Sequence, residues 1–100
     1  MPKMNVTVPH ALGLETANER LKGFMGKIKE KYQSQVSNLE ESWAGNTLNF
    51  GFTTFGFPIK GAVNVEQNQV VLDGDLPFAA MMFKGKIEQE IKDQLARLLA

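Results

Sequence analysis

The sequence predicts a single α+β domain, a two-layer sandwich of order β-α-β-β-β-β-α in which two helices pack on one face of a mainly antiparallel sheet. Three observations predict this class. Several short stretches alternate apolar and polar residues, as strands with one buried face do, and two longer stretches repeat apolar residues at the helical period. Short connections make the last four strands antiparallel neighbours. Because each strand keeps a polar face, we expect the helices to cover only one side of the sheet.

The N-terminal third of the chain contains the first strand and the first helix. Residues 4–8 alternate between apolar and polar, and Pro9 ends this strand. Helical periodicity then predicts one continuous helix from Leu14 to Tyr32. Gly23 and Gly26 fall on its outer face, where each costs about 1 kcal/mol relative to alanine, so packing must hold this helix in place. Its apolar stripe comprises Leu14, Ala17, Leu21, Phe24, Met25, Ile28 and Tyr32.

A hairpin is predicted in the middle of the chain. Strands at Leu39–Trp43 and Thr47–Thr53 flank the turn residues 44–46, whose Ala-Gly-Asn sequence is typical of a hairpin. In the first of these strands Glu41 shares a face with the apolar residues on either side of it. Two interpretations remain open: Glu41 lies at the lip of the sheet, or a β-bulge changes the faces.

Two further strands complete the sheet. The first is Phe57–Val65, where the early proline, Pro58, indicates an edge or a position without a ladder hydrogen bond. The turn at residues 67–69 leads to the last strand, which ends near Leu76. The sequence does not fix where the first strand enters this sheet.

One long amphipathic helix is predicted to close the protein. It begins at Leu76-Pro77, where proline suits the first turn, and Asp75 is close enough to cap the free backbone amides. Burying each large side chain of its stripe contributes about 1.5–3 kcal/mol, so this helix is a main source of stability. The predicted stripe comprises Ala80, Phe83, Ile87, Ile91, Leu95 and Leu98.

The beginning of this helix is more apolar than its packing requires. Phe78, Met81 and Met82 lie off the core stripe, and Lys84 and Lys86 follow directly; we call these five residues the contact patch. One interpretation is structural, with the phenylalanine packing back on the helix start and the methionines filling gaps at the sheet edge. The other is functional: the patch contacts a second subunit, giving a homodimer through Phe78–Met82, or an apolar surface with the lysines at its rim.

Composition excludes several classes of function. Eleven basic and eleven acidic residues give a formal net charge of zero, so nonspecific binding to nucleic acid is not expected. The absence of cysteine excludes a disulfide framework and thiolate chemistry, and it fits a cytoplasmic protein. The N-terminus does not resemble a signal peptide, and no apolar run approaches the ~20 residues of a transmembrane segment.

The sequence supplies no catalytic, cofactor-binding or metal-binding constellation, and we expect a protein that is not an enzyme. His10 is the only histidine, without the partner ligands that a metal needs or the nucleophile that a general base needs. We expect its imidazole to organise the strand–helix loop through hydrogen bonds. Asp73 and Asp75 point to the same face of a strand end, but two carboxylates without further ligands predict solvated side chains.

Three motifs carry a resemblance to a known family. The run from Val8 to Gly13 (VPHALG), the run from Trp43 to Leu48 (WAGNTL) and the run from Asp75 to Ala79 (DLPFA) are similar to the opening, middle and close of the polyhydroxyalkanoic acid system family. The resemblance covers nearly the whole chain. It implies a small bacterial cytoplasmic protein of the polyhydroxyalkanoate (PHA) storage system, associated with granules or with granule proteins, and it brings no catalytic residues to this chain.

An alternative function comes from the predicted architecture. A curved antiparallel sheet around a long helix suits a small-molecule binding protein that holds an acyl or hydroxyacyl chain in a cavity between the sheet and the C-terminal helix. Gly51, Gly61 and Gly74 would help the curvature or leave room for a ligand. The chain length of one hundred residues leaves little volume beyond the core, which counts against this alternative.

Overall fold

The computed structural model describes residues 3–32, 34–54 and 56–100 of the chain. Its elements follow the predicted order of strands and helical regions, but the first helical region contains two helices and a 3-10 helix, η1, precedes the last α-helix. In chain order they are β1 (Lys3–Pro9), α1 (Leu14–Leu21), α2 (Phe24–Lys31), β2 (Val36–Ala44), β3 (Thr47–Thr54), β4 (Phe57–Val65), β5 (Gln69–Asp75), η1 (Phe78–Phe83) and α3 (Lys84–Leu99).

The five strands form one antiparallel sheet in the order β1-β5-β4-β3-β2. The last four strands are sequential neighbours, as their short connections predicted. The first strand, whose place the sequence left open, pairs with β5 and is therefore an edge strand. Pro58 lies in a central strand, but pairing between β4 and β5 begins only at Lys60, so one side of the proline is locally unpaired.

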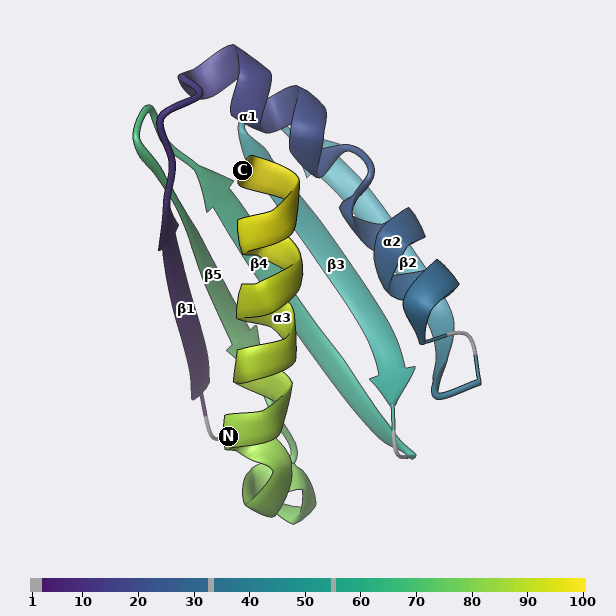
Figure 1. Cartoon of the computed structure of the whole chain (residues 1–100). Coiled ribbons are helices and arrows are strands. Elements are labelled where there is room, and N and C mark those ends of the chain that lie inside the picture. The colour runs from purple at the N-terminus through teal and green to yellow at the C-terminus, as the bar shows by residue number, and fades with distance from the viewer. Residues whose placement is uncertain (1–2, 33, 55) are drawn as a thin grey trace.

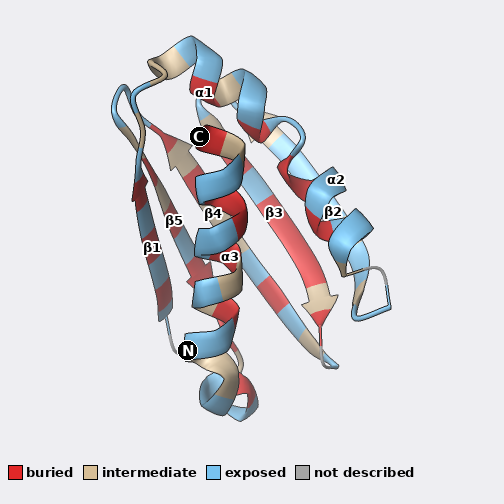
Figure 2. Cartoon of the chain, in the orientation of Figure 1, coloured by how far each residue is buried: buried red, intermediate tan, exposed pale blue. Residues whose placement is uncertain are grey.

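The helices lie on one face of this sheet, which confirms the predicted α+β class (Figure 1). Figure 2 shows buried residues alternating along the strands and gathered on the helix sides that face the sheet. The core fills the space between these layers. Its largest fully buried side chains are Phe24, Met4, Leu21, Leu48, Ile59, Leu72, Leu76, Leu95, Val63 and Val70.

The first helical region is interrupted, whereas the sequence predicted one continuous helix. α1 ends at Leu21, and α2 begins at Phe24 after Gly23, which has φ −93° and ψ 0°. Propensity explains the position of the break, because glycine destabilises a helix interior and offers no side chain to pack. The two helices on either side of the break have different neighbours: α1 packs against α3 and β4, and α2 packs against β2 and α3.

The bulge that the sequence left open is present in β2. The pairing with β3 shifts between Ser37 and Glu40, and Asn38 adopts a positive φ of 54°. The shift includes Leu39, the first residue of the predicted strand, whereas Glu41 and Trp43 follow it in regular register with β3. Glu41 pairs with Phe50 and is exposed, because β2 is the edge strand and the lip of the sheet is open there.

The C-terminal segment differs from the prediction in three details. It begins as the 3-10 helix η1 after Pro77, and the α-helix starts only at Lys84. The predicted cap is wrong: η1 has no side-chain cap, and Asp75 instead forms a salt bridge with Lys3 across β1 and β5. At the other end the stripe buries Leu99, whereas the predicted Leu98 is only half-buried.

Candidate functional site

The three apolar members of the contact patch are exposed. Phe78 is 75% exposed, Met81 49% and Met82 82%, and they are the large hydrophobic side chains exposed in the described part of the chain. Phe78 and Met82 therefore do not pack on the helix start or fill gaps, as the structural interpretation expected, whereas about half of Met81 is covered. Lys86 is also exposed, and Lys84 is half-buried.

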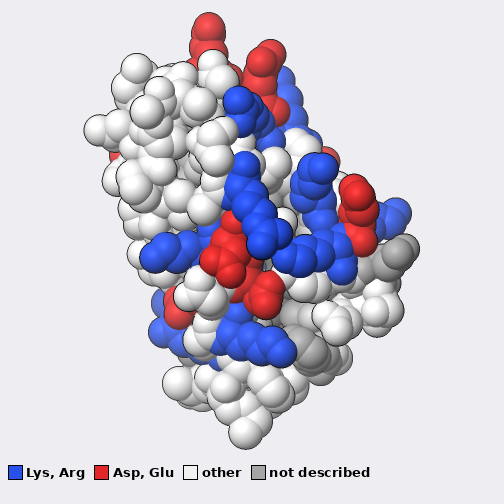
Figure 3. All heavy atoms as spheres, viewed as in Figure 1, with Lys and Arg blue, Asp and Glu red and all other residues white. Residues whose placement is uncertain are grey.

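The fold holds the patch on a fixed turn at one end of the molecule. In Figure 1, η1 extends below the sheet, and Figure 3 shows uncharged atoms at this end with lysine or arginine atoms directly above them. Ala80 is fully buried and anchors the turn, and its backbone N–H donates to the Pro77 carbonyl over 2.9 Å. Phe83 packs on the core with its ring centroid 6.3 Å from that of Phe57. The exposed side chains are therefore presented by an anchored segment.

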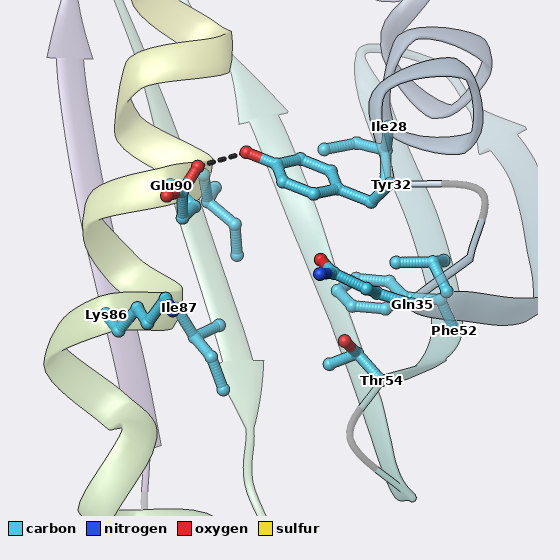
Figure 4. A pocket seen from close by; sticks show the side chains of 10 residues that line it. Ile28, Tyr32, Gln35, Phe52, Thr54, Lys86, Ile87 and Glu90 are labelled. Carbon is cyan, nitrogen blue, oxygen red and sulfur yellow. Dashed lines mark hydrogen bonds between the residues drawn. The ribbon is translucent and has the colours of Figure 1, made fainter.

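A pocket of about 270 Å³ lies between α3, the end of α2 and the sheet (Figure 4). The pocket occupies the place that the alternative function requires, between the sheet and the C-terminal helix. Its walls are mainly apolar, and its polar groups come from five side chains. The apolar residues are Ile28, Val36, Phe52, Ile87 and Ile91, and the polar ones are Tyr32, Gln35, Thr54, Lys86 and Glu90.

One hydrogen bond crosses this pocket. The Tyr32 hydroxyl, just beyond α2, donates to the Glu90 carboxylate on α3, as Figure 4 shows. Burial raises the pKa of the Tyr32 hydroxyl to about 12, and the hydrogen bond and negative charge of Glu90 act in the same direction. Both groups are half-buried, and they are separated by 58 positions in the sequence.

Titration of Tyr32 provides a direct test of this contact, because Tyr32 is the only tyrosine. We expect the tyrosinate absorbance of the folded chain to rise with a midpoint near pH 12, compared with about 10 in denaturant. Because the folded-state pKa is raised, Tyr32 stabilises the fold below pH ~10, and this contribution is lost as the pH rises towards 12. The Glu90→Gln variant should have a lower midpoint, and an unchanged midpoint would contradict the contact.

Gln94 is a buried polar residue near this contact that sequence reasoning missed. It is only 6% exposed, and its Nε2 has no hydrogen-bond partner within the described part of the chain. Its side-chain amide lies close to the Tyr32 hydroxyl and acts to lower the pKa of that group, but Gln94 is not among the residues that line the pocket. The spacing in the sequence could have indicated its burial, because Gln94 is three residues after Ile91 and shares its helix face. The predicted stripe was assigned from apolar residues only and therefore omitted a glutamine.

His10 lies in the loop between β1 and α1, at the end of the sheet opposite η1 (Figure 1). Its Nδ1 accepts a hydrogen bond from the Leu12 backbone N–H over 3.1 Å, so Nε2 carries the proton and donates to the Glu66 carbonyl at 3.0 Å. The His10 backbone N–H donates to the Asn68 carbonyl. These bonds join the β1–α1 loop to the β4–β5 turn. His10 is therefore not brought together with the contact patch.

The aspartates of β5 are paired with side chains of β1. Asp73 accepts a hydrogen bond from the Asn5 amide over 2.6 Å, and Asp75 pairs with Lys3. Residues 3–32, 34–54 and 56–100 contain no group of three or more His, Cys, Asp or Glu side chains placed to hold a metal ion. No helix in these ranges has the length and apolar content of a membrane span.

Comparison with solved structures shows the fold. A protein titled "DynU16 crystal structure, a putative protein in the dynemicin biosynthetic locus" matches 97% of this chain with a TM-score of 0.61 and 12% identity. The chain spans 46% of that protein, less than half its length. The crystal structure of TTHA0849 from Thermus thermophilus matches 98% of this chain and 92% of its own length, with a TM-score of 0.46 and 14% identity.

Comparison with curated proteins finds no significant match. The profile of a protein family described as "Putative polyhydroxyalkanoic acid system protein" matches residues 4–99. The match includes every motif from which the resemblance was inferred, and it extends over both the pocket and the contact patch. The chain therefore belongs to the polyhydroxyalkanoic acid system family.

Proposed function

We propose that this protein is a non-enzymatic accessory protein of the PHA storage system that binds the granule surface, or a protein on it, through the contact patch. The observation that carries the proposal is the exposure of Phe78, Met81 and Met82. Family membership directs the choice of surface, because a PHA granule is the apolar phase of that system. Cytoplasmic granules are the location that follows from this proposal.

The composition of the patch suits binding to an apolar surface. Full burial of a Phe or Met side chain contributes about 1.5–3 kcal/mol, and Phe78 and Met82 retain most of their area for such a contact. Lys84 and Lys86 follow in the first turn of α3. Long lysine side chains extend their alkyl parts along an apolar boundary while their ammonium groups remain in water.

Sedimentation with isolated PHA granules tests the proposal. We expect the wild-type chain to sediment with granules and the Met82→Glu variant to remain largely in the supernatant, because a carboxylate at the centre of the contact would have to lose its hydration. A matched control is Ala96→Glu, which adds the same charge at an exposed position near the other end of α3.

Two outcomes would contradict granule binding. One is a wild-type chain that stays in the supernatant at every granule concentration, and the other is equal sedimentation of the two glutamate variants. If Met82→Glu instead converts a dimer into a monomer, measured by analytical ultracentrifugation, the patch is the surface of a homodimer.

The pocket supports a second candidate function, the binding of a small acyl or hydroxyacyl molecule. The supporting observation is the apolar volume between α3 and the sheet, lined by Phe52, Ile87 and Ile91 among others. The volume of about 270 Å³ is just below the usual range of ligand sites, so the ligand would be small. Titration with methyl hexanoate, followed by amide chemical shifts, should give saturable shifts at these three residues. Unchanged spectra at millimolar ester would contradict this function.

A further inference from the structure

The sheet has two edges, formed by β1 and β2, and they differ in how their outward backbone groups are used (Figure 1). At the β1 edge the backbone N–H of Asn5 donates to the Glu88 carboxylate of α3 over 3.1 Å, and α3 packs along this strand. Pro9, the last residue of β1, has no N–H to offer. The β1 edge is therefore protected against pairing with another strand.

The β2 edge leaves the backbone groups of Glu41 and Trp43 open. The Val65 N–H donates to the carbonyl of Asn46, just before β3, over 2.9 Å, so even-numbered residues of β3 bond to β4 and odd-numbered residues bond to β2. Glu41 and Trp43 lie opposite even-numbered residues of β3, so their N–H and C=O groups point away from the sheet. No hydrogen bond to these outward groups is found in the described part of the chain.

The side chains at this edge combine an aromatic ring with a negative charge. Glu41 and Trp43 share the face that the helices cover, because they lie opposite the buried Phe50 and Leu48. Trp43 is half-buried against the core, whereas Glu41 is exposed and forms no salt bridge with the described residues. A strand added at this edge would therefore meet a carboxylate and, two positions further along β2, the tryptophan.

The charge of β2 indicates which kind of strand fits. The register with β3 is regular from Glu40 to Ala44, and the β-bulge before it limits the open stretch to this half of β2. A second copy of the chain would bring Glu40 and Glu41 of both molecules, four carboxylates, to one short seam, and like charges across strands are unfavourable. A strand that carries a positive charge is therefore favoured over a second copy.

We propose that the β2 edge binds an extended basic segment of a partner protein, which adds as a sixth strand antiparallel to residues 40–44. The segment carries an apolar residue opposite Trp43 and, two positions later, a lysine or arginine opposite Glu41. Backbone hydrogen bonds to the outward groups give affinity, and the two side-chain pairs give specificity. The inference goes beyond both proposed functions, because residues 40–44 belong to neither the contact patch nor the pocket.

Titration of the full chain with the capped peptide Thr-Phe-Thr-Lys-Thr tests the proposal, followed by NMR amide shifts and by the fluorescence of Trp43. In antiparallel pairing its phenylalanine lies opposite Trp43 and its lysine opposite Glu41. We expect saturable shifts centred on β2, and binding at least about fivefold weaker when glutamate replaces the lysine, a ratio that corresponds to about 1 kcal/mol. Equal binding of the two peptides, or no saturable shift in β2 at millimolar peptide, would overturn the proposal.

Methylation of the peptide backbone separates strand addition from charge attraction alone. In the bound peptide the lysine N–H faces β2, whereas the N–H of the threonine after it faces solvent. N-methylation of the lysine should weaken binding at least about tenfold, because it removes a ladder hydrogen bond and places a methyl group in the seam. N-methylation of that threonine is the matched control and should leave binding largely unchanged. Equal effects of the two methyl groups would overturn strand addition.

Charge reversal assigns the preference to its residue. Glu41→Lys should invert it, so that the glutamate peptide binds at least about fivefold more tightly than the lysine peptide. Glu40→Lys is the matched control: it makes the same change at the adjacent exposed position, whose side chain lies on the other face of the strand, and it should keep the original preference. A preference that Glu41→Lys leaves unchanged, or that both variants invert, would overturn the assigned pairing. Dimerisation of the chain alone through β2, measured by analytical ultracentrifugation and NMR, would assign the edge to a second copy and overturn the basic partner.

Discussion

The Gly61→Ala variant should unfold with a free energy about 2–3 kcal/mol lower than that of the wild-type chain, the upper part of the range for overpacked cores. A β-carbon at Gly61 would lie 2.4 Å from the Asp73 carbonyl oxygen and 2.9 Å from both the Gly74 Cα and the Phe50 Cζ. Two of these three atoms belong to the backbone of β5, so they cannot move aside by changing a rotamer. Strands β4 and β5 would have to separate locally.

Gly61 is one member of a row that crosses the sheet. It pairs with Phe50 on β3 and with Gly74 on β5, and Gly74 pairs with Met4 on β1. The two glycines leave the space that the Phe50 ring and the fully buried Met4 side chain fill. Close packing of this kind leaves no free volume for an added methyl group.

Gly26→Ala is the matched control for Gly61→Ala. Gly26 lies within α2 and is exposed, and a methyl group added there would have nothing within 4 Å of it. Alanine is favoured over glycine in a helix, so this variant should gain about 0.5–1 kcal/mol. Chemical denaturation followed by the fluorescence of the single tryptophan, Trp43, measures both variants. Equal stability of Gly61→Ala and the wild type would show that the row across the sheet is not closely packed.

The sheet was predictable because strand signals are local. Alternation and short turns identified every strand and the order of the last four, and both depend on residues close together in the sequence. The position of β1 depends on pairing between residues such as Lys3 and Asp75, which are 72 positions apart. The alternation within residues 3–9 predicts a strand, but it does not indicate that this strand pairs with β5. The prediction that Asp75 caps the last helix was wrong for the same reason: Asp75 pairs with Lys3, which is distant in the sequence, and not with the helix.

The helices were predictable in their faces but not in their limits. The apolar stripe of the first helical region is buried at Ala17, Leu21, Phe24, Met25 and Ile28, although the helix is broken at Gly23. The stripe persists because both halves must cover the same core. The break depends on how each half packs against α3 and the sheet, and this is tertiary information.

The two candidate sites differ in how far the sequence reveals them. The contact patch is contiguous in the chain, so separating the helix faces was enough to identify Phe78 and Met82 as residues that the core does not need. The pocket brings together residues from α2, β2, β3 and α3. The sequence allowed a cavity between the sheet and the last helix only as an alternative, and the pairing of Tyr32 with Glu90 depends on how α2 and α3 are placed.

The Phe24→Ala variant should lose about 3–5 kcal/mol of unfolding free energy, the largest effect expected of a single truncation here. Phe24 is 2% exposed at the start of α2, and its ring meets that of Phe50 edge-to-face with centroids 6.5 Å apart. Truncation removes this contact and leaves a cavity beneath the helix. Since small domains are stable by only about 5–15 kcal/mol, thermal unfolding should begin at a clearly lower temperature. A loss below about 1 kcal/mol would contradict the position of Phe24 in the core.

Phe78→Ala makes the same chemical change at the contact patch and should alter the stability by no more than about 0.5 kcal/mol. The difference follows from burial alone, because Phe78 is 75% exposed and its removal leaves no cavity. The pair therefore separates the two uses of phenylalanine in this chain. If Phe78→Ala keeps its stability and sediments less with PHA granules, the loss belongs to the surface contact. If it unfolds as readily as Phe24→Ala, Phe78 contributes to the fold, and the proposed contact loses its main support.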